Sequence, residues 1–156
     1  MRKLSFATAA TATLAVLLGA SAALAGPPVH SATGGGTVDW PGGRVTYGFT
    51  AQIDAAGVVT GQAEFQHRDS GITNHVVINC LTVVGNTAWL GGTITISSDP
   101  TLVGVEIVWE VEDNGQGNAA SPDQVSNVQP EVAPGTCNSQ PALGLIPWTH
   151  GKVQVQ

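Results

Sequence analysis

The chain has 156 residues, a formal net charge of -6 and only 10% charged residues. Its length fits a single domain, and it is too short for a barrel of alternating strands and helices. Five Lys and Arg residues cannot form the basic cluster with which proteins neutralise nucleic-acid phosphates. Composition therefore predicts a small acidic domain with no nucleic-acid partner.

Residues 1–25 have the three parts of a secretory signal peptide. Arg2 and Lys3 form a positive start, residues 14–18 centre an apolar stretch, and residues 23–25 (Ala-Leu-Ala) fit the small-x-small cleavage pattern. We therefore expect a secreted protein, which would be extracellular, or periplasmic in a double-membrane bacterium. No later segment is long and apolar enough for an integral membrane helix.

Two cysteines, Cys80 and Cys137, remain after the expected cleavage. An even number of cysteines in an exported protein predicts a disulfide. The bond would close a loop of about 60 residues, for which the chain-entropy model gives about 4 kcal/mol of stabilisation. Two cysteines without a CxxC or HxxxH partner pattern make a poor zinc site, and no cofactor is expected.

Apolar and polar residues alternate with period two along most of the mature chain, which predicts strands. A Pro-rich lead-in at 26–33 precedes a single domain at 34–156. The strands that we expect are 37–40, 44–54, 58–68, 74–84, 87–98, 103–113, 124–128 and 152–156. Turn sequences rich in Gly, Asn, Asp and Pro separate them, and residues 129–149 are expected to form a long surface loop.

Short strands with turn signals between them, and no sustained helical spacing, predict an all-β fold. We expect a single antiparallel β-barrel, a meander of about eight strands. Its last strand would lie beside the first and so remove two exposed edges. A β-sandwich is the alternative.

Several short patterns occur in a fixed order along the mature chain. They are Gly34-Gly35-Gly36-Thr37, Thr46-Tyr47-Gly48-Phe49-Thr50-Ala51, Gly61-Gln62-Ala63-Glu64-Phe65 with His67 just after, Gly85-Asn86-Thr87-Ala88, Val111-Glu112-Asp113-Asn114-Gly115, Asp123 and Gly151-Lys152-Val153-Gln154-Val155. Together they resemble the post-COAP domain family, small secreted bacterial β modules found beside choice-of-anchor regions. The two cysteines and the longer segment 129–149 depart from the family pattern. The resemblance implies an exported bacterial domain of unknown function, with no catalytic residues to carry over.

The densest acidic cluster contains Glu110, Glu112, Asp113, Asn114 and Asp123. Oxygen ligands in a glycine-rich loop suit Ca²⁺, so Asp113, Asn114 and Asp123 are weak calcium candidates. The EF-hand spacing is absent, and the glutamates more simply form the solvated face of a strand. We therefore predict no metal site.

His67 and His75 flank a predicted turn, and a hairpin would bring them near each other, with Asp69 available as a third metal or acid–base group. More simply, His67 continues the apolar face of its strand. Glu64 and Glu110 both occupy polar faces, so the opposed carboxylates of a glycosidase are not predicted. No catalytic residue is assigned.

These observations predict a secreted, non-catalytic β module, structural or interaction-mediating, with an unidentified protein or surface partner outside the cell. A carrier of a small apolar ligand is the first alternative, because eight-stranded barrels can hold one small molecule. A secreted hydrolase is a weaker alternative. The large inward candidates favour a filled interior: Tyr47, Phe49, Phe65, Leu90, Ile107 and Trp109.

Overall fold

The computed structural model describes residues 27–117, 120–131 and 135–156, so the expected signal peptide lies outside the described residues. The described part contains ten strands and two short 3-10 helices. The strands are β1 (Pro28–Trp40), β2 (Gly43–Asp54), β3 (Val59–His67), β4 (Thr73–Val84), β5 (Thr87–Ser97), β6 (Glu106–Glu112), β7 (Gln124–Ser126), β8 (Gln129–Pro130), β9 (Leu145–Pro147) and β10 (His150–Val155). The helices are η1 (Pro100–Leu102) and η2 (Thr136–Ser139).

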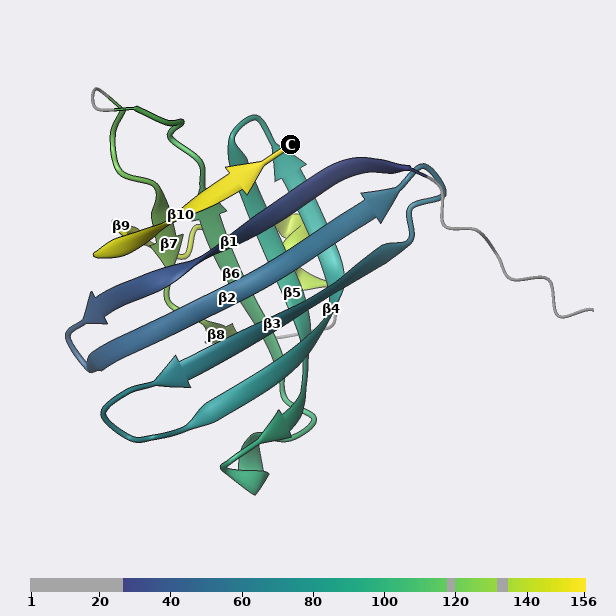
Figure 1. Cartoon of the computed structure of the whole chain (residues 1–156). Helices are drawn as coiled ribbons and strands as arrows, with labels where there is room; N and C mark the ends of the chain where they lie inside the picture. The colour runs from purple at the N-terminus through teal and green to yellow at the C-terminus, as the bar shows by residue number, and fades with distance from the viewer. Residues whose placement is uncertain (1–26, 118–119, 132–134) are drawn as a thin grey trace, which may run out of the picture.

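All strands belong to one antiparallel sheet in the order β10-β1-β2-β3-β4-β5-β6-β7-β9, with β8 also paired to β6. The sheet curls so that β10 and β1–β3 form one layer and β5–β6 lie behind it (Figure 1). The all-β prediction is confirmed, and β10 lies beside β1 as expected. Among the described residues, no backbone ladder joins β10 to β7 or β9, so the sheet is a half-barrel rather than a closed barrel.

The first strand begins at Pro28, well before the expected start at Thr37. Glycine carries no side chain, so the triple glycine at 34–36 hides the alternation that marks a strand. A Cβ at Gly34 would lie 2.8 Å from the ring of Phe49 and 2.9 Å from a carbonyl oxygen of β10. These glycines therefore belong to β1 because the core and β10 approach its backbone closely.

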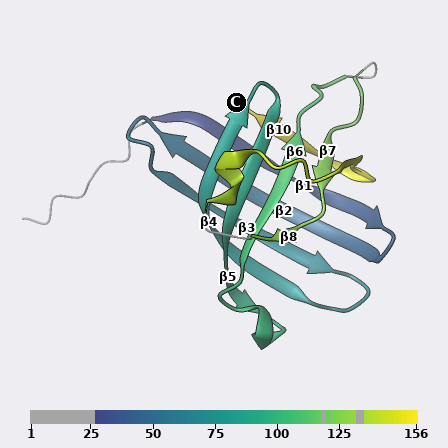
Figure 2. The ribbon, with the colours of Figure 1, turned by 180° about the vertical axis from the view of Figure 1, so that it is seen from behind.

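The segment 129–149, expected as a loop, instead contains β8, η2 and β9. It crosses the outer face of the sheet, with η2 lying over β4 and β5 (Figure 2). The strand expected at 103–113 begins only at Glu106, because η1 precedes it. Asp99 caps η1 by accepting a hydrogen bond from the Thr101 N–H at 3.0 Å.

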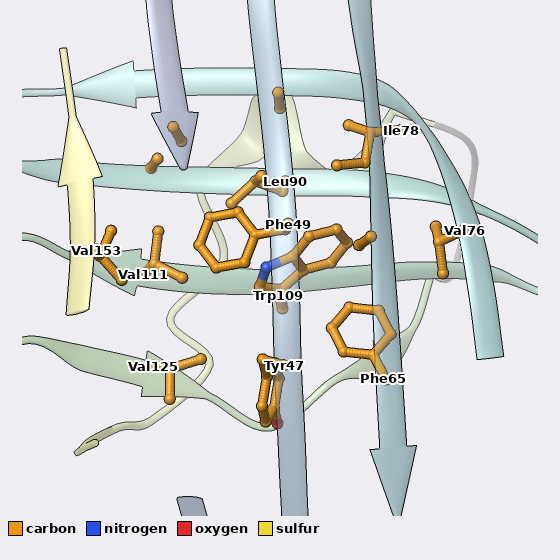
Figure 3. Packing of buried hydrophobic residues seen from close by; sticks show 14 of the residues in the cluster. Tyr47, Phe49, Phe65, Val76, Ile78, Leu90, Trp109, Val111, Val125 and Val153 are labelled. Atoms are coloured by element: carbon orange, nitrogen blue, oxygen red, sulfur yellow. The ribbon is translucent and has the colours of Figure 1, made fainter. Parts of the chain in front are cut away.

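Aromatic rings interlock in the core between the two layers (Figure 3). Tyr47 contacts Phe65 and Trp148 with ring centroids 5.2 and 5.4 Å apart, and Trp109 contacts Phe65 and Phe49 at 5.1 and 6.1 Å. All four pairs are edge-to-face, the arrangement that aromatic quadrupoles favour, worth about 0.5–1.5 kcal/mol each beyond burial. These rings belong to one buried hydrophobic cluster between the two layers.

The hydroxyl of Tyr47 links the core to the rim of the sheet. It accepts a hydrogen bond from the indole N–H of Trp40 at 3.2 Å and donates one to the Ser126 carbonyl oxygen at 3.4 Å. Burial raises the pKa of Tyr47 from 10.0 to about 12, and the Trp40 hydrogen bond opposes that rise. The neutral phenol is therefore part of the folded structure.

Tyr47 is the sole tyrosine of the sequence, so phenolate absorbance reports its ionisation directly. Its pKa is higher in the folded than in the unfolded chain, so its contribution to stability is complete below pH 10.0 and disappears as the pH rises through about 12. We expect the free energy of unfolding to fall by about 3 kcal/mol across that window. Denaturant titrations at increasing pH measure the fall, and Tyr47→Phe should remove this component. A phenolate that forms near pH 10 in the folded protein would contradict the prediction.

Candidate functional site

Two aspartates bridge the open side of the half-barrel. The Asp123 Oδ2 atom accepts a hydrogen bond from the Val153 N–H at 2.7 Å, and the Asp113 Oδ2 atom accepts one from the Val155 N–H at 3.0 Å. These two N–H groups belong to the edge of β10 that no strand covers. The carboxylates thus take the place of the missing backbone ladder, and we call this set of contacts the seam.

The remaining carboxylate oxygens of the seam also bind backbone. Asp123 Oδ1 accepts the Asn114 N–H at 2.8 Å, and Asp113 Oδ1 accepts the Gly115 N–H at 2.9 Å. The side-chain amide of Asn114 donates to the Pro122 carbonyl oxygen at 2.9 Å. The structure therefore brings the calcium candidates Asp113, Asn114 and Asp123 together and engages each of them with the backbone. No group of three or more His, Cys, Asp or Glu suited to a metal occurs among the described residues.

The predicted disulfide between Cys80 and Cys137 is present, with the two Cα atoms 6.2 Å apart. It lies on the outer face of the sheet and, with Val108, forms a small second core that is separate from the aromatic one. Trp89 packs against this second core and donates its indole N–H to the Pro141 carbonyl oxygen at 2.9 Å. The crosslink holds η2 against β4.

Glutamates of β6 also hold the covering segment in place. Glu110, expected on a solvated face, is only 8% exposed, because its Oε2 atom accepts the Leu143 N–H at 3.1 Å. Glu106 accepts a short hydrogen bond from the Thr93 hydroxyl. Burial, with a smaller contribution from the charge of Glu106, raises the pKa of the Glu131 carboxyl, and backbone N–H groups oppose the rise. Glu110 and Glu131 thus bind backbone groups of the covering segment, whereas Glu106 binds β5.

The two histidines lie on opposite faces of the sheet, so the hypothesis of a paired site is wrong. His67 is half-buried at the end of β3, on the core side. His75 points outward from β4, and its Nδ1 atom lies 3.4 Å from the Glu64 Oε2 atom. Asp69 accepts the Arg44 backbone N–H at 3.2 Å. The two histidines lie on different faces because successive side chains along a strand point to alternate faces of the sheet.

A groove of about 720 Å³ crosses the outer face of β2, β3 and β4 and reaches β5. Pairs of register partners in β2 and β3 lie in rows along the groove. The pair Gly48 and Glu64 lies between the pair Thr46 and Gln66 and the pair Thr50 and Gln62. On the β4 and β5 side it is lined by His75, Val77 and Ile96. The groove offers hydroxyl, amide, carboxylate and imidazole groups side by side.

The groove was not predicted from the sequence. Alternation showed that its residues point outward, which is typical of any solvated strand. The signal that could have found it is Thr-x-Gly-x-Thr in one strand followed by Gln-x-Glu-x-Gln in the next, residues 46–50 and 62–66. The pairing register is needed to show that these two patterns lie opposite each other.

Comparison of the chain with models of known protein families, with curated proteins and with solved structures found no match. Within the described part of the chain, no helix has both the length and the apolar content to cross a membrane.

Asp123→Ala tests the seam. The change removes both acceptors of Asp123 and leaves the Val153 N–H buried without a partner, so we expect a loss of about 2–3 kcal/mol in the free energy of unfolding. Hydrogen exchange at the Val153 amide should quicken. Asp99→Ala is the control, because it removes an exposed helix cap and should cost about 1 kcal/mol. Equal losses, with unchanged exchange at Val153, would refute the seam.

Reduction of the disulfide tests its role in the fold. Cys80 and Cys137 are separated by 57 residues, and the chain-entropy model gives such a crosslink about 4 kcal/mol. We expect the Cys80→Ser/Cys137→Ser variant to unfold at a lower denaturant concentration by about that free energy. Amides of β4 beneath η2 should lose more protection from exchange than amides of β2. Uniform loss of protection would argue against a local fastening role.

Proposed function

We propose that this chain is a secreted, non-catalytic β module that binds a partner outside the cell through the outer face of β2–β4. The observation that carries the proposal is the groove across that face. Thr50, Gln62 and Gln66 line it, and although their backbones belong to the sheet ladders, their side chains make no hydrogen bond to another described residue. Their polar groups are therefore free for a partner, whereas the carboxylates of the seam are occupied by backbone N–H groups.

The interior favours a module over a carrier. The side chains of Trp109, Phe65 and Leu90 are almost fully buried and lie in one contiguous cluster. A cavity for a drug-sized ligand typically measures about 300–1,000 Å³, and edge-to-face rings occupy the centre of this half-barrel (Figure 3). The buried side chains of the interior stabilise the fold, so in this proposal the partner binds at the surface.

The patterns that resemble the post-COAP family bear on how the proposed module closes. Three of its patterns, at 111–115, at Asp123 and at 151–155, meet at the seam through the hydrogen bonds of Asp113 and Asp123. These patterns therefore describe how the module closes. The disulfide is of the kind that persists in oxidising compartments, which supports secretion.

Depletion of the purified, disulfide-bonded protein from solution by insoluble polysaccharides and peptidoglycan tests the proposal. We expect retention on at least one polymer without release of soluble sugar. Gln62→Ala/Gln66→Ala should weaken retention by about tenfold, equivalent to about 1.4 kcal/mol. Glu112→Ala, an outward change on the other layer, is the control and should leave retention unchanged. Release of sugar, or retention that is insensitive to the groove variant, would contradict the proposal.

A further inference from the structure

Gly48 is a strand glycine that the fold does not explain. It lies in the middle of β2, in unbroken register with Gly35 on one side and Glu64 on the other. Its φ is not positive, and a Cβ placed on it would meet no atom within 4 Å. By contrast, a Cβ at Gly34, Gly61 or Gly92 would collide with neighbouring atoms.

Glycine inside a strand weakens the strand, because it loses more conformational freedom on folding and offers no side chain to pack. The unbroken register excludes a bulge at Gly48, and a further common reason for a strand glycine is the close approach of a ligand or another backbone. Gly48 lies at the floor of the outer groove. The glycine thus points to an occupant that touches the backbone of β2.

The chemistry around Gly48 identifies the kind of occupant. Thr50 and Gln62 supply donors and acceptors without partners, and Glu64 supplies a carboxylate that is 56% exposed beside His75. At the β4 and β5 side, Val77 and Ile96 are 52% and 64% exposed. Polar groups that mix donors and acceptors, next to small apolar surfaces, match a ring that carries both hydroxyls and C–H faces.

Other occupants fit less well. The groove crosses the face of the strands, whose backbone groups already form the ladders of β2, β3 and β4, so an extended peptide could not add to a sheet edge there. A polyanionic ligand would be repelled by the Glu64 carboxylate and by the negative charge of a chain with eleven acidic residues. Arg68 lies at one end, where its Nε–H donates to the Thr46 hydroxyl at 3.0 Å.

We propose that this groove is the binding site of a neutral oligosaccharide, a proposal that rests on the binding function proposed above and specifies its ligand class. A sugar ring lies over Gly48, its hydroxyls paired with Gln62, Glu64 and Gln66. The neighbouring ring extends toward Val77 and Ile96. A volume of about 720 Å³ is within the range of small-molecule sites.

The test uses the purified, disulfide-bonded protein and short soluble oligosaccharides as probes. The neutral probes are β-linked oligomers of glucose, xylose, mannose and N-acetylglucosamine, and an oligogalacturonate is the anionic probe. Amide NMR spectra report the place of binding, and calorimetry reports affinity. We expect a neutral probe to shift the Gly48 amide and the side-chain amides of Gln62 and Gln66.

Gly48→Gln should fill the groove without strain and weaken binding by at least about tenfold. Asn79→Gln enlarges an exposed side chain of β4 outside the groove and should bind as the unchanged protein does. Melting temperatures establish that each variant folds. Should Gly48→Gln fail to fold, Glu64→Gln replaces it, with weaker binding expected.

Three outcomes would overturn the inference: full affinity in Gly48→Gln, shifts confined to another face, or binding of the anionic probe alone. If no neutral probe binds while polymer retention persists, the oligosaccharide inference is wrong and the proposed binding function stands. If the protein is also retained on no polymer, the proposed function fails as well.

Discussion

The structure depends on how the free edge of β10 is satisfied. A sheet that curls without closing leaves backbone N–H groups facing inward along its last strand, and an unpaired buried N–H is costly. Asp113 and Asp123 remove that cost with one carboxylate oxygen each. With β10 held in place, the regular ladder between β10 and β1 fixes β1 in turn. The glycines of β1 leave room for the aromatic rings that pack against them. Closure by side chains thus determines both the curl of the sheet and the room available to the core.

The same contacts limit the chemistry that the protein can perform. Carboxylates whose oxygens all accept backbone hydrogen bonds are positioned for structure, and Glu110 is likewise committed to the Leu143 N–H. Binding or catalysis needs polar groups that are not consumed by the fold. The side chains of Thr50, Gln62 and Gln66, on outward positions of β2 and β3, are such groups among the described residues, and the proposed binding function rests on them. That proposal places function on the surface of the sheet rather than in the fold itself.

Alternation along the sequence predicted the long strands and the all-β class, because burial on one face imposes a period of two. The pairing of Cys80 with Cys137 followed from export and from an even count. Residues 28–33 were missed because the prolines at their start indicated a lead-in rather than a strand, and residues 34–36 because glycine hides the period. Asp113 and Asp123 were weak calcium candidates in the sequence. Their structural role could not be predicted, because a sequence does not show which backbone N–H groups lack ladder partners. The groove depends on register between β2 and β3, which alternation alone does not determine.

The outer face of the sheet is divided between two uses. Over β4–β6 it is covered by described residues between 135 and 149, which the disulfide, Trp89 and Glu110 hold in place (Figure 2). Over β2 and β3 it carries no such cover, and there the chain keeps Gly48, at the expense of strand stability, in open space. A sequence under selection for stability alone would gain from alanine at that position. The proposed occupant of the groove accounts for this glycine, because it would lie against the backbone of β2 between the pair Thr46 and Gln66 and the pair Thr50 and Gln62.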